Sequence, residues 1–182
     1  MATFDVSQFR AQLKNGGARP NQFKVELNFP TGVAGGTTAQ RASTFLVNVS
    51  ELPGQTINPA IVLYRGREVK FAGDRIYAPW TTTVLNDTQF TVRTAIERWM
   101  NLMDDLQDKT GEIAPSAYLA DLTVTQLDRN GEELKKYFVR DAFPVDLSGV
   151  PLDFGANDQI SQFTCTWQFQ DLVIAGNAGA VV

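Results

Sequence analysis

The segment 162–170 carries the most restrictive pattern in the chain, because its apolar and polar side chains alternate without interruption. Successive side chains of a strand point to opposite faces of a sheet, so the pattern predicts a strand with one buried and one exposed face. The apolar face is expected to hold Phe163, Cys165, Trp167 and Phe169. The polar face is expected to hold Gln162, Thr164, Thr166, Gln168 and Gln170. Such a strand needs partner strands and an apolar layer to cover it.

Other segments also favour strands, so the chain is predicted to be rich in sheet. Apolar residues alternate with polar ones over 23–29, and Pro30 is expected to end that strand. Further strands are predicted at 45–49, 61–64, 69–71, 81–85, 118–127 and 134–143. Residues 128–131 read Asp-Arg-Asn-Gly, which is typical of a hairpin turn. No repeat or linker interrupts the series, so 1–182 is interpreted as a single domain.

One long helix is predicted at about 88–108. Its apolar residues recur at spacings of three and four, which places them on one face; they are Val92, Ile96, Trp99, Met103 and Leu106. Asn86, Asp87 or Thr88 can cap its start, and Gly111 can end it. The expected fold class is therefore mainly β, a β-sandwich or β-barrel with one long flanking α-helix.

Four segments lack a regular pattern. Residues 1–22 are interpreted as an N-terminal arm, and 31–44 as a flexible polar loop. Residues 51–60 contain two prolines and form a long irregular connection that is expected to extend from the body, because long loops are often functional. Residues 176–182 are interpreted as a flexible C-terminal tail.

The composition argues against catalysis. The chain has no histidine, one cysteine and a net charge of −4. It therefore lacks the commonest general base and metal ligand, and it lacks the basic balance of a phosphate-binding protein. The glycines at 32–36 are not followed by the Gly-Lys-Ser/Thr of a phosphate loop. We expect no catalytic residues, no metal and no cofactor.

Targeting and membrane segments are not expected either. The N-terminal residues lack a basic region followed by an apolar one, so we expect no signal peptide. No apolar run approaches the ~20 residues of a membrane helix, so we expect no membrane segment.

The order of motifs between Leu52 and Asn101 resembles the tail tube proteins of contractile-tailed bacteriophages (myoviruses), which are related to the inner-tube proteins of type VI secretion. The motifs are Leu52-Pro53-Gly54, Tyr64-Arg65-Gly66-Arg67, Gly73-Asp74-Arg75 with Tyr77 and Trp80, Asn86-Asp87 with Phe90, and Arg93 with Ala95, Glu97, Trp99, Met100 and Asn101. Gly131 in its hairpin and Phe143-Pro144 agree with the same pattern. The resemblance covers roughly residues 20–170.

The resemblance implies a structural role. Six copies form a ring, their inner sheets join into one barrel around a channel, and rings stack into a tube inside a contractile sheath. The implied partners are the protein itself, the tail sheath protein, and the baseplate and tail terminator proteins. Genomic DNA passes through the channel without specific binding. The implied location is the virion tail, assembled in the host bacterial cytoplasm.

Three sets of residues are candidates for these roles. The inter-ring loop is expected to use Leu52, Pro53, Gly54, Ile57 and Pro59. Candidates for the channel wall face away from the apolar sides of their strands; they are Glu26, Asn28, Thr164, Thr166 and Gln168. Candidates for the outer, sheath-facing surface lie on the acidic side of the predicted helix; they are Asp104, Asp105 and Asp108.

Other functions stay open at this point. The same fold could serve as the inner tube of a phage-derived injection or secretion apparatus: a tailocin, a type VI secretion system or an extracellular injection particle. A monomeric barrel that binds a small ligand would instead hold a closed apolar pocket. An enzyme would require a cleft with converging carboxylates.

Overall fold

The computed structural model describes residues 5–13, 17–108 and 110–175. Its helices are α1 (Val6–Gln12), α2 (Gly36–Leu46), α3 (Thr91–Met103) and α4 (Pro115–Tyr118). Its strands are β1 (Phe23–Glu26), β2 (Val47–Ser50), β3 (Gln55–Tyr64), β4 (Arg67–Tyr77), β5 (Trp80–Leu85), β6 (Ala120–Leu127), β7 (Glu133–Leu147), β8 (Gln162–Gln168) and β9 (Asp171–Ala175). Strands predominate, as the sequence predicts.

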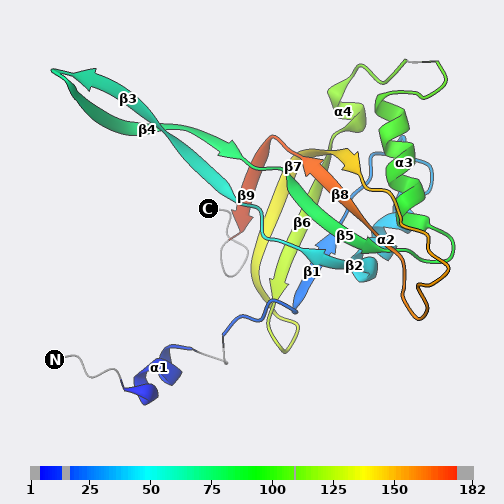
Figure 1. Ribbon diagram of the computed structural model, residues 1–182, viewed down its shortest axis with the longest axis horizontal. Coiled ribbons are helices and arrows are strands. Elements are labelled where there is room, and N and C mark those ends of the chain that lie inside the picture. Colours follow the sequence, from blue (N-terminus) through cyan, green and yellow to red (C-terminus); the bar gives the residue numbers. More distant parts are fainter. Residues whose placement is uncertain (1–4, 14–16, 109, 176–182) are drawn as a thin grey trace.

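One seven-stranded antiparallel sheet forms the body (Figure 1), in the order β1-β6-β7-β8-β5-β2, with β9 paired to β7. Strand β7 is 15 residues long and has two sets of neighbours. Its first part pairs with β6 and β9, and residues 143–147 pair with β8. We call β1, β6, β9 and the first part of β7 the first sheet half. The second sheet half consists of β2, β5, β8 and residues 143–147.

The prediction of a mainly β fold is confirmed in this coarse form, with two differences. The hydrogen-bonded path of the described strands begins at β1 and ends at β2, so it is an open path and not a closed barrel. The described part of the chain also contains α2 and α4, whereas the sequence predicts one flanking helix beside the arm. None of the described helices is long and apolar enough to cross a membrane.

The core lies where the two sheet halves meet α2 and α3. The predicted alternation of β8 is confirmed, because Phe163, Cys165 and Trp167 are buried. Trp99 of α3 packs on Trp167 with ring centroids 5.5 Å apart. Both indoles keep a partner: Trp99 Nε1 donates to the Tyr118 carbonyl at 2.7 Å, and Trp167 Nε1 donates to Thr82 Oγ1 at 2.9 Å. The two rings therefore fill the core without leaving an unpaired N–H group.

Helix α3 begins at Thr91, slightly after the predicted start at about 88, and one of the predicted capping residues serves it. The Asp87 carboxylate accepts hydrogen bonds from the Thr91 N–H at 2.7 Å and from Thr91 Oγ1 at 2.6 Å. The first of these bonds satisfies a free donor of the first turn, so Asp87 caps the helix although Phe90 occupies the N-cap position. Val92, Ile96 and Trp99 are buried on its core side.

The predicted end of this helix is wrong. It ends at Met103, and Leu106 lies beyond it with 75% of its side chain exposed. The following turn folds back on the last helical carbonyls, since the Glu112 N–H donates to the Leu102 carbonyl at 3.0 Å. A Cβ at Gly111 would clash with the Met103 carbonyl oxygen. Gly111 therefore permits a close approach to the helix and does not cap it.

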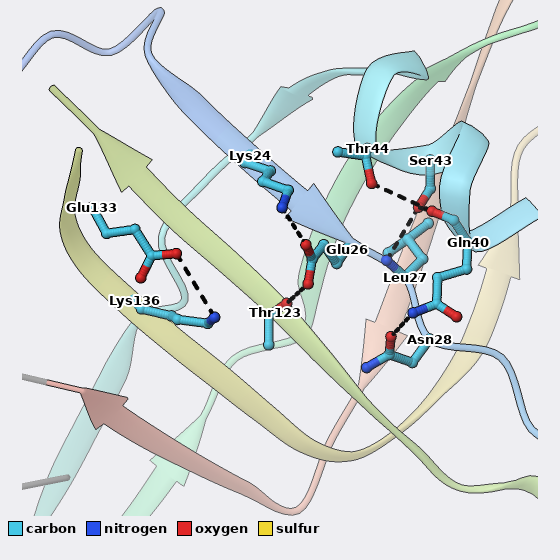
Figure 2. A network of polar contacts seen from close by, with 10 residues as sticks. All are labelled: Lys24, Glu26, Leu27, Asn28, Gln40, Ser43, Thr44, Thr123, Glu133 and Lys136. Carbon is cyan, nitrogen blue, oxygen red and sulfur yellow. Dashed lines mark hydrogen bonds and ion pairs between the residues drawn. The ribbon is translucent and has the colours of Figure 1, made fainter. Parts of the chain in front are cut away.

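The prediction of a flexible loop at 31–44 is also wrong, because α2 occupies most of this segment. The buried positions of this helix are all small residues, Gly36, Ala39 and Ser43, which allows close packing. Ser43 Oγ accepts from the Leu27 N–H at 3.2 Å and donates to the Gln40 carbonyl at 2.7 Å (Figure 2). A short helix depends on such tertiary contacts more than on propensity, so local sequence does not reveal it.

Residues 55–60 are a strand and not part of an irregular connection. They begin β3, which pairs with β4 in a separate two-stranded sheet that projects far from the body (Figure 1). The hairpin predicted around Arg65 and Gly66 is thus confirmed, and it is much longer than predicted. A register shift between Ile57 and Pro59 accommodates the proline. Gly73 lies beside this shift, where a Cβ would come within 2.5 Å of the Asn58 carbonyl oxygen.

Smaller differences concern the ends of elements. Strand β1 stops at Glu26, well before Pro30, and Phe45 belongs to α2. Strand β9 follows β8 and is absent from the prediction. Helix α1 lies within the segment interpreted as an arm and is apart from the sheets (Figure 1). The tail predicted at 176–182 lies outside the described residues.

Replacing Trp99 with alanine is expected to reduce the free energy of unfolding by about 3–5 kcal/mol, because it empties a fully buried site. The matched control is Leu106→Ala, which removes an exposed side chain and should change stability by less than about 0.5 kcal/mol. Denaturant titration of both variants measures the difference. Equal losses would show that the buried face of α3 is assigned wrongly.

The Cys165 thiol gives a pH-dependent prediction. Burial, and secondly the negative charge of Asp146, raises the pKa of Cys165 well above its usual range. The folded state then keeps a proton that the unfolded state loses above about pH 8.5, so stability falls as pH rises, by up to about 1.4 kcal/mol per pH unit. Unfolding of the native protein and of Cys165→Ala between pH 8 and 10 should show this additional slope in the native protein alone. Parallel stability curves would contradict the prediction.

Candidate assembly surfaces

The hairpin formed by β3 and β4 is exposed along almost its whole length. Every residue of β3 is exposed, and Tyr77 is the one partly buried position of β4. Its exposed large apolar side chains are Ile57, Ile61, Val62, Leu63, Tyr64, Val69, Phe71 and Ile76. Isolated two-stranded hairpins are marginally stable, and contiguous exposed apolar patches mark interaction sites. The hairpin is therefore the strongest candidate for an interface.

The turn of the hairpin suits its twist, and the hairpin as a whole is basic. Arg65 and Gly66 both have positive φ, at 49° and 79°, which is the turn geometry that matches the twist of paired strands. Residues 55–77 contain four basic side chains and two acidic ones, although the whole chain has a net charge of −4. The rest of the chain is therefore more acidic than the total indicates.

The structure divides the predicted inter-ring residues between the body and the hairpin. Leu52, Pro53 and Gly54 precede β3, and Pro53 is buried at its base. Ile57 and Pro59 lie in β3, and the Ile57 side chain is exposed. Sequence reasoning missed the exposed apolar side chains near the turn, at 61–64. Their strand pattern was visible in the sequence, but neither the length of the hairpin nor its exposure was.

Threonines dominate the uncovered face of the second sheet half. Thr83 lies opposite Thr164 and Thr81 opposite Thr166 in the β5–β8 pair, and the Oγ1 atoms of Thr83 and Thr164 are 3.4 Å apart. The alternate residues of both strands are buried in the core. Thr164, Thr166 and Gln168 therefore face away from the core, as predicted, and β5 extends the same surface. We call this surface the threonine face.

The threonine face is almost free of charge. Strands β2, β5 and β8 contain no charged residue. Asn48 Nδ2 of β2 donates to Gln162 Oε1 of β8 at 3.2 Å. Asp146 of β7 lies opposite Thr166 at the other edge. The face thus presents mainly hydroxyl and amide groups, with the exposed Val49 beside Thr83 and with one acidic residue at its border.

Glu26 lies on a different surface, because β6 and β7 separate β1 from β8. Its carboxylate pairs with Lys24, and Thr123 Oγ1 donates to it at 3.3 Å (Figure 2). The hydrogen bond from the Lys24 ammonium lowers the pKa of Glu26. Lys136 and Glu133 form a further pair nearby, with 4.0 Å between Nζ and Oε1. The first sheet half therefore presents ion pairs where the second presents threonines.

Asn28 connects elements of the body. Its Nδ2 donates to the Asp121 carbonyl at 2.5 Å, and its Oδ1 accepts from Gln40 Nε2 at 2.6 Å. These bonds tie the segment after β1 to α2 and to β6. The five residues predicted for the channel wall thus do not form one surface: those of β8 lie together, and Glu26 and Asn28 lie apart from them.

The acidic residues predicted on a helix face form a turn after α3. Asp105 Oδ1 accepts from the N–H groups of Gln107 and Asp108 at 2.7 and 3.2 Å, so this carboxylate organises the turn. Asp104 and Asp108 are exposed beside it. Within the described ranges, no three His, Cys, Asp or Glu side chains are grouped so that they could hold a metal ion.

Comparison with known proteins identifies the family. A family model described as phage tail tube protein matches residues 18–175. The tail tube protein of Serratia phage KSP90 is 27% identical over 171 residues, which cover 93% of this chain and 95% of that protein. Tail tube protein gp19 of Enterobacteria phage T4 is 25% identical over 150 residues, which cover 82% of this chain and 86% of that protein.

Solved structures share the fold. A chain in the baseplate of the anti-feeding prophage superposes with a TM-score of 0.60 at 16% identity, over 87% of this chain and 95% of that one. A chain in the sheath–tube complex of an extracellular contractile injection system, PVC, superposes with a TM-score of 0.57 at 15% identity, over 96% of this chain and 100% of that one. Since the family model spans nearly all of the sheet and its helices, this chain belongs to the phage tail tube protein family.

Proposed function

We propose that six copies of this tail tube subunit close into a ring with the threonine face inside, and that rings stack into a hollow tube through which DNA passes. The observation that carries the proposal is the threonine face itself. It is uncovered in the single chain, and strands β2, β5 and β8 contain no charged residue. A polar, uncharged wall suits a channel for a polyanion.

The edges of the second sheet half support ring closure. Strand β2 ends the hydrogen-bonded path, so one of its sides is unpaired in the single chain. Residues 143–147 form the opposite edge, because the pairing of β6 with β7 extends only to Ala142. If the β2 edge of one copy pairs with the β7 edge of the next, the sheet continues around the ring. Closure also removes edges that otherwise invite uncontrolled association.

The charge of the wall affects how DNA moves. Each basic side chain that neutralises a phosphate adds salt-dependent affinity, which would retard a passing duplex. The threonine face avoids this affinity, and Asp146 at its border repels phosphate. Lys24 and Lys136, by contrast, belong to the first sheet half (Figure 2), which the proposal places outside the channel.

The outer surface is proposed to meet the sheath, and the tube ends to meet baseplate and terminator proteins. Trp99 packs α3 on the core side of β8, so the acidic turn that follows α3 lies on the side away from the threonine face. Asp104 and Asp108 are exposed there and are assigned to the sheath-facing surface. The two similar chains come from a baseplate and from a sheath–tube complex, which supports these partners.

Thr166→Lys is expected to slow genome ejection by about tenfold at low salt, since every ring would gain a full set of positive charges in the channel. Tube assembly should be unaffected. The matched control is Thr166→Gln, a neutral side chain of similar length, which should eject DNA at nearly the normal rate. Ejection is measured in phage that carry each variant, across a salt series. A normal rate with the lysine variant would contradict the assignment of the channel wall.

Replacing residues 56–75 with a short Gly-Ser linker is expected to abolish polymerisation and leave the subunit folded. Tyr77 is kept because its hydroxyl donates to Asp171 Oδ1 at 2.9 Å and its ring packs on Phe169 at 5.3 Å. The body should then keep its thermal midpoint, because the hairpin contributes no buried core residue. Sedimentation and negative-stain microscopy measure assembly. Normal tubes from this variant would show that the hairpin is not an assembly element.

A further inference from the structure

The loop between β7 and β8, residues 148–161, carries another exposed apolar surface. Leu152 and Phe154 are 91% and 108% exposed, and Ile160 is also exposed. The ends of this β7–β8 loop are nevertheless held: the Ser148 N–H donates to the Thr164 carbonyl and the Asn86 N–H donates to the Ser161 carbonyl, both at 2.9 Å. The apolar side chains are therefore presented to solvent from a fixed base.

The β7–β8 loop surrounds an open hollow of about 1050 Å³. The residues that line it include Leu85 of β5 and, from the loop, Leu152, Phe154, Ile160, Asp153 and Asp158. These two aspartates are the only charged residues of the loop. The hollow is therefore apolar and acidic, and its volume can receive several side chains.

The tip of the β3–β4 hairpin, Ile61–Lys70, has the opposite charge and the same apolar character. Leu63 is 75% exposed at the tip, and Ile61, Val62 and Tyr64 are exposed around it. Three basic residues accompany them and one acidic residue; they are Arg65, Arg67, Lys70 and Glu68. The Arg65 guanidinium lies 5.4 Å from the centre of the Tyr64 ring, so apolar and basic groups share one surface.

The two surfaces lie at opposite ends of the chain. In Figure 1 the hairpin points to the left along the longest axis, and the β7–β8 loop, drawn in orange, lies at the right. They cannot meet within one chain, so the partner of each surface is another molecule. A contact between two different surfaces of identical chains is head-to-tail, and such contacts build rings and open filaments.

We infer that the hairpin tip of one copy occupies the hollow of the β7–β8 loop of a second copy. Leu63 and its apolar neighbours enter the hollow, and Arg65 and Arg67 face Asp153 and Asp158. Contacts between like surfaces are disfavoured, because two hairpin tips would bring basic groups together and two loops would bring acidic groups together. The inference rests on the proposed tube, since it names the surface that receives the hairpin.

Charge exchange between the two surfaces tests the inference. Arg65→Glu with Arg67→Glu is expected to lower the yield of sedimenting tubes by at least about tenfold, since like charges then face each other. Asp153→Lys with Asp158→Lys should do the same. The chain with all four changes should recover most of the yield, because the attraction is restored with the signs exchanged.

The matched control combines the two hairpin changes with Asp104→Lys and Asp108→Lys, which restores the net charge at another place. This control should not recover tubes. The inference is overturned if the hairpin variant assembles normally, if the exchanged chain does not recover, or if the control recovers equally well. If a sheath protein were the true occupant of the hollow, the hairpin variant would assemble normally, which is the first of these results.

Cross-linking separates this inference from the proposed function. A mixture of Leu63→Cys and Phe154→Cys chains should form a disulfide-linked dimer under mild oxidation, and neither variant alone should; the native Cys165 is buried and does not interfere. Tubes without the cross-link would overturn the inference and leave the proposed function intact. A native protein that forms no tubes would instead count against the proposed function, and the cross-link would still report on this contact.

Discussion

The packing of Trp99 on Trp167 is the contact on which the arrangement of the subunit depends. The rings are 5.5 Å apart, and the hydrogen bonds of their N–H groups to Tyr118 and Thr82 fix their orientation. This contact holds α3 against one face of β8. Because a strand directs alternate side chains to opposite faces, the threonines of β8 must then point away from the core. The interior and the open surface of the second sheet half are thus set by the same contact.

Strand β7 connects the two sheet halves and keeps their surfaces separate. Its first part pairs with β6 and β9, and its last residues pair with β8. One half presents ion pairs around Lys24 and Glu26, whereas the other presents hydroxyl and amide groups. The proposed channel wall is therefore confined to one part of a continuous sheet, and these ion pairs lie on another part of it.

The single chain leaves surfaces that only assembly can cover. The hairpin and the β7–β8 loop expose large apolar side chains, and α1 presents Val6, Phe9 and Leu13 along one side. Exposed strands of this length would be an aggregation hazard in a monomer. In the proposed tube they are the means of association, and their opposite charges would favour contacts in one direction along the polymer.

By itself, the sequence determined the features that arise from local spacing. The alternation at 162–169, the stripe of Val92, Ile96 and Trp99, and the Asp87 cap all agree with the structure, because each depends on neighbouring residues. The motif order also placed the chain in its family. Only the tertiary structure showed that α2 is a helix, because its small residues gain stability from contacts with Leu27 and the core and not from propensity.

The length of the hairpin and the separation of Glu26 from Thr166 were likewise decided at the tertiary level. An exposed hairpin has no buried face, so strand signals mark only the parts of it near the turn and not its full length. The surface to which a residue belongs depends on the order of the strands in the sheet. Strands β6 and β7 lie between β1 and β8, although β1 is far from all three in sequence. Long-range pairing has no local pattern, so the sequence predicts the faces of each strand and the structure alone assembles them into surfaces.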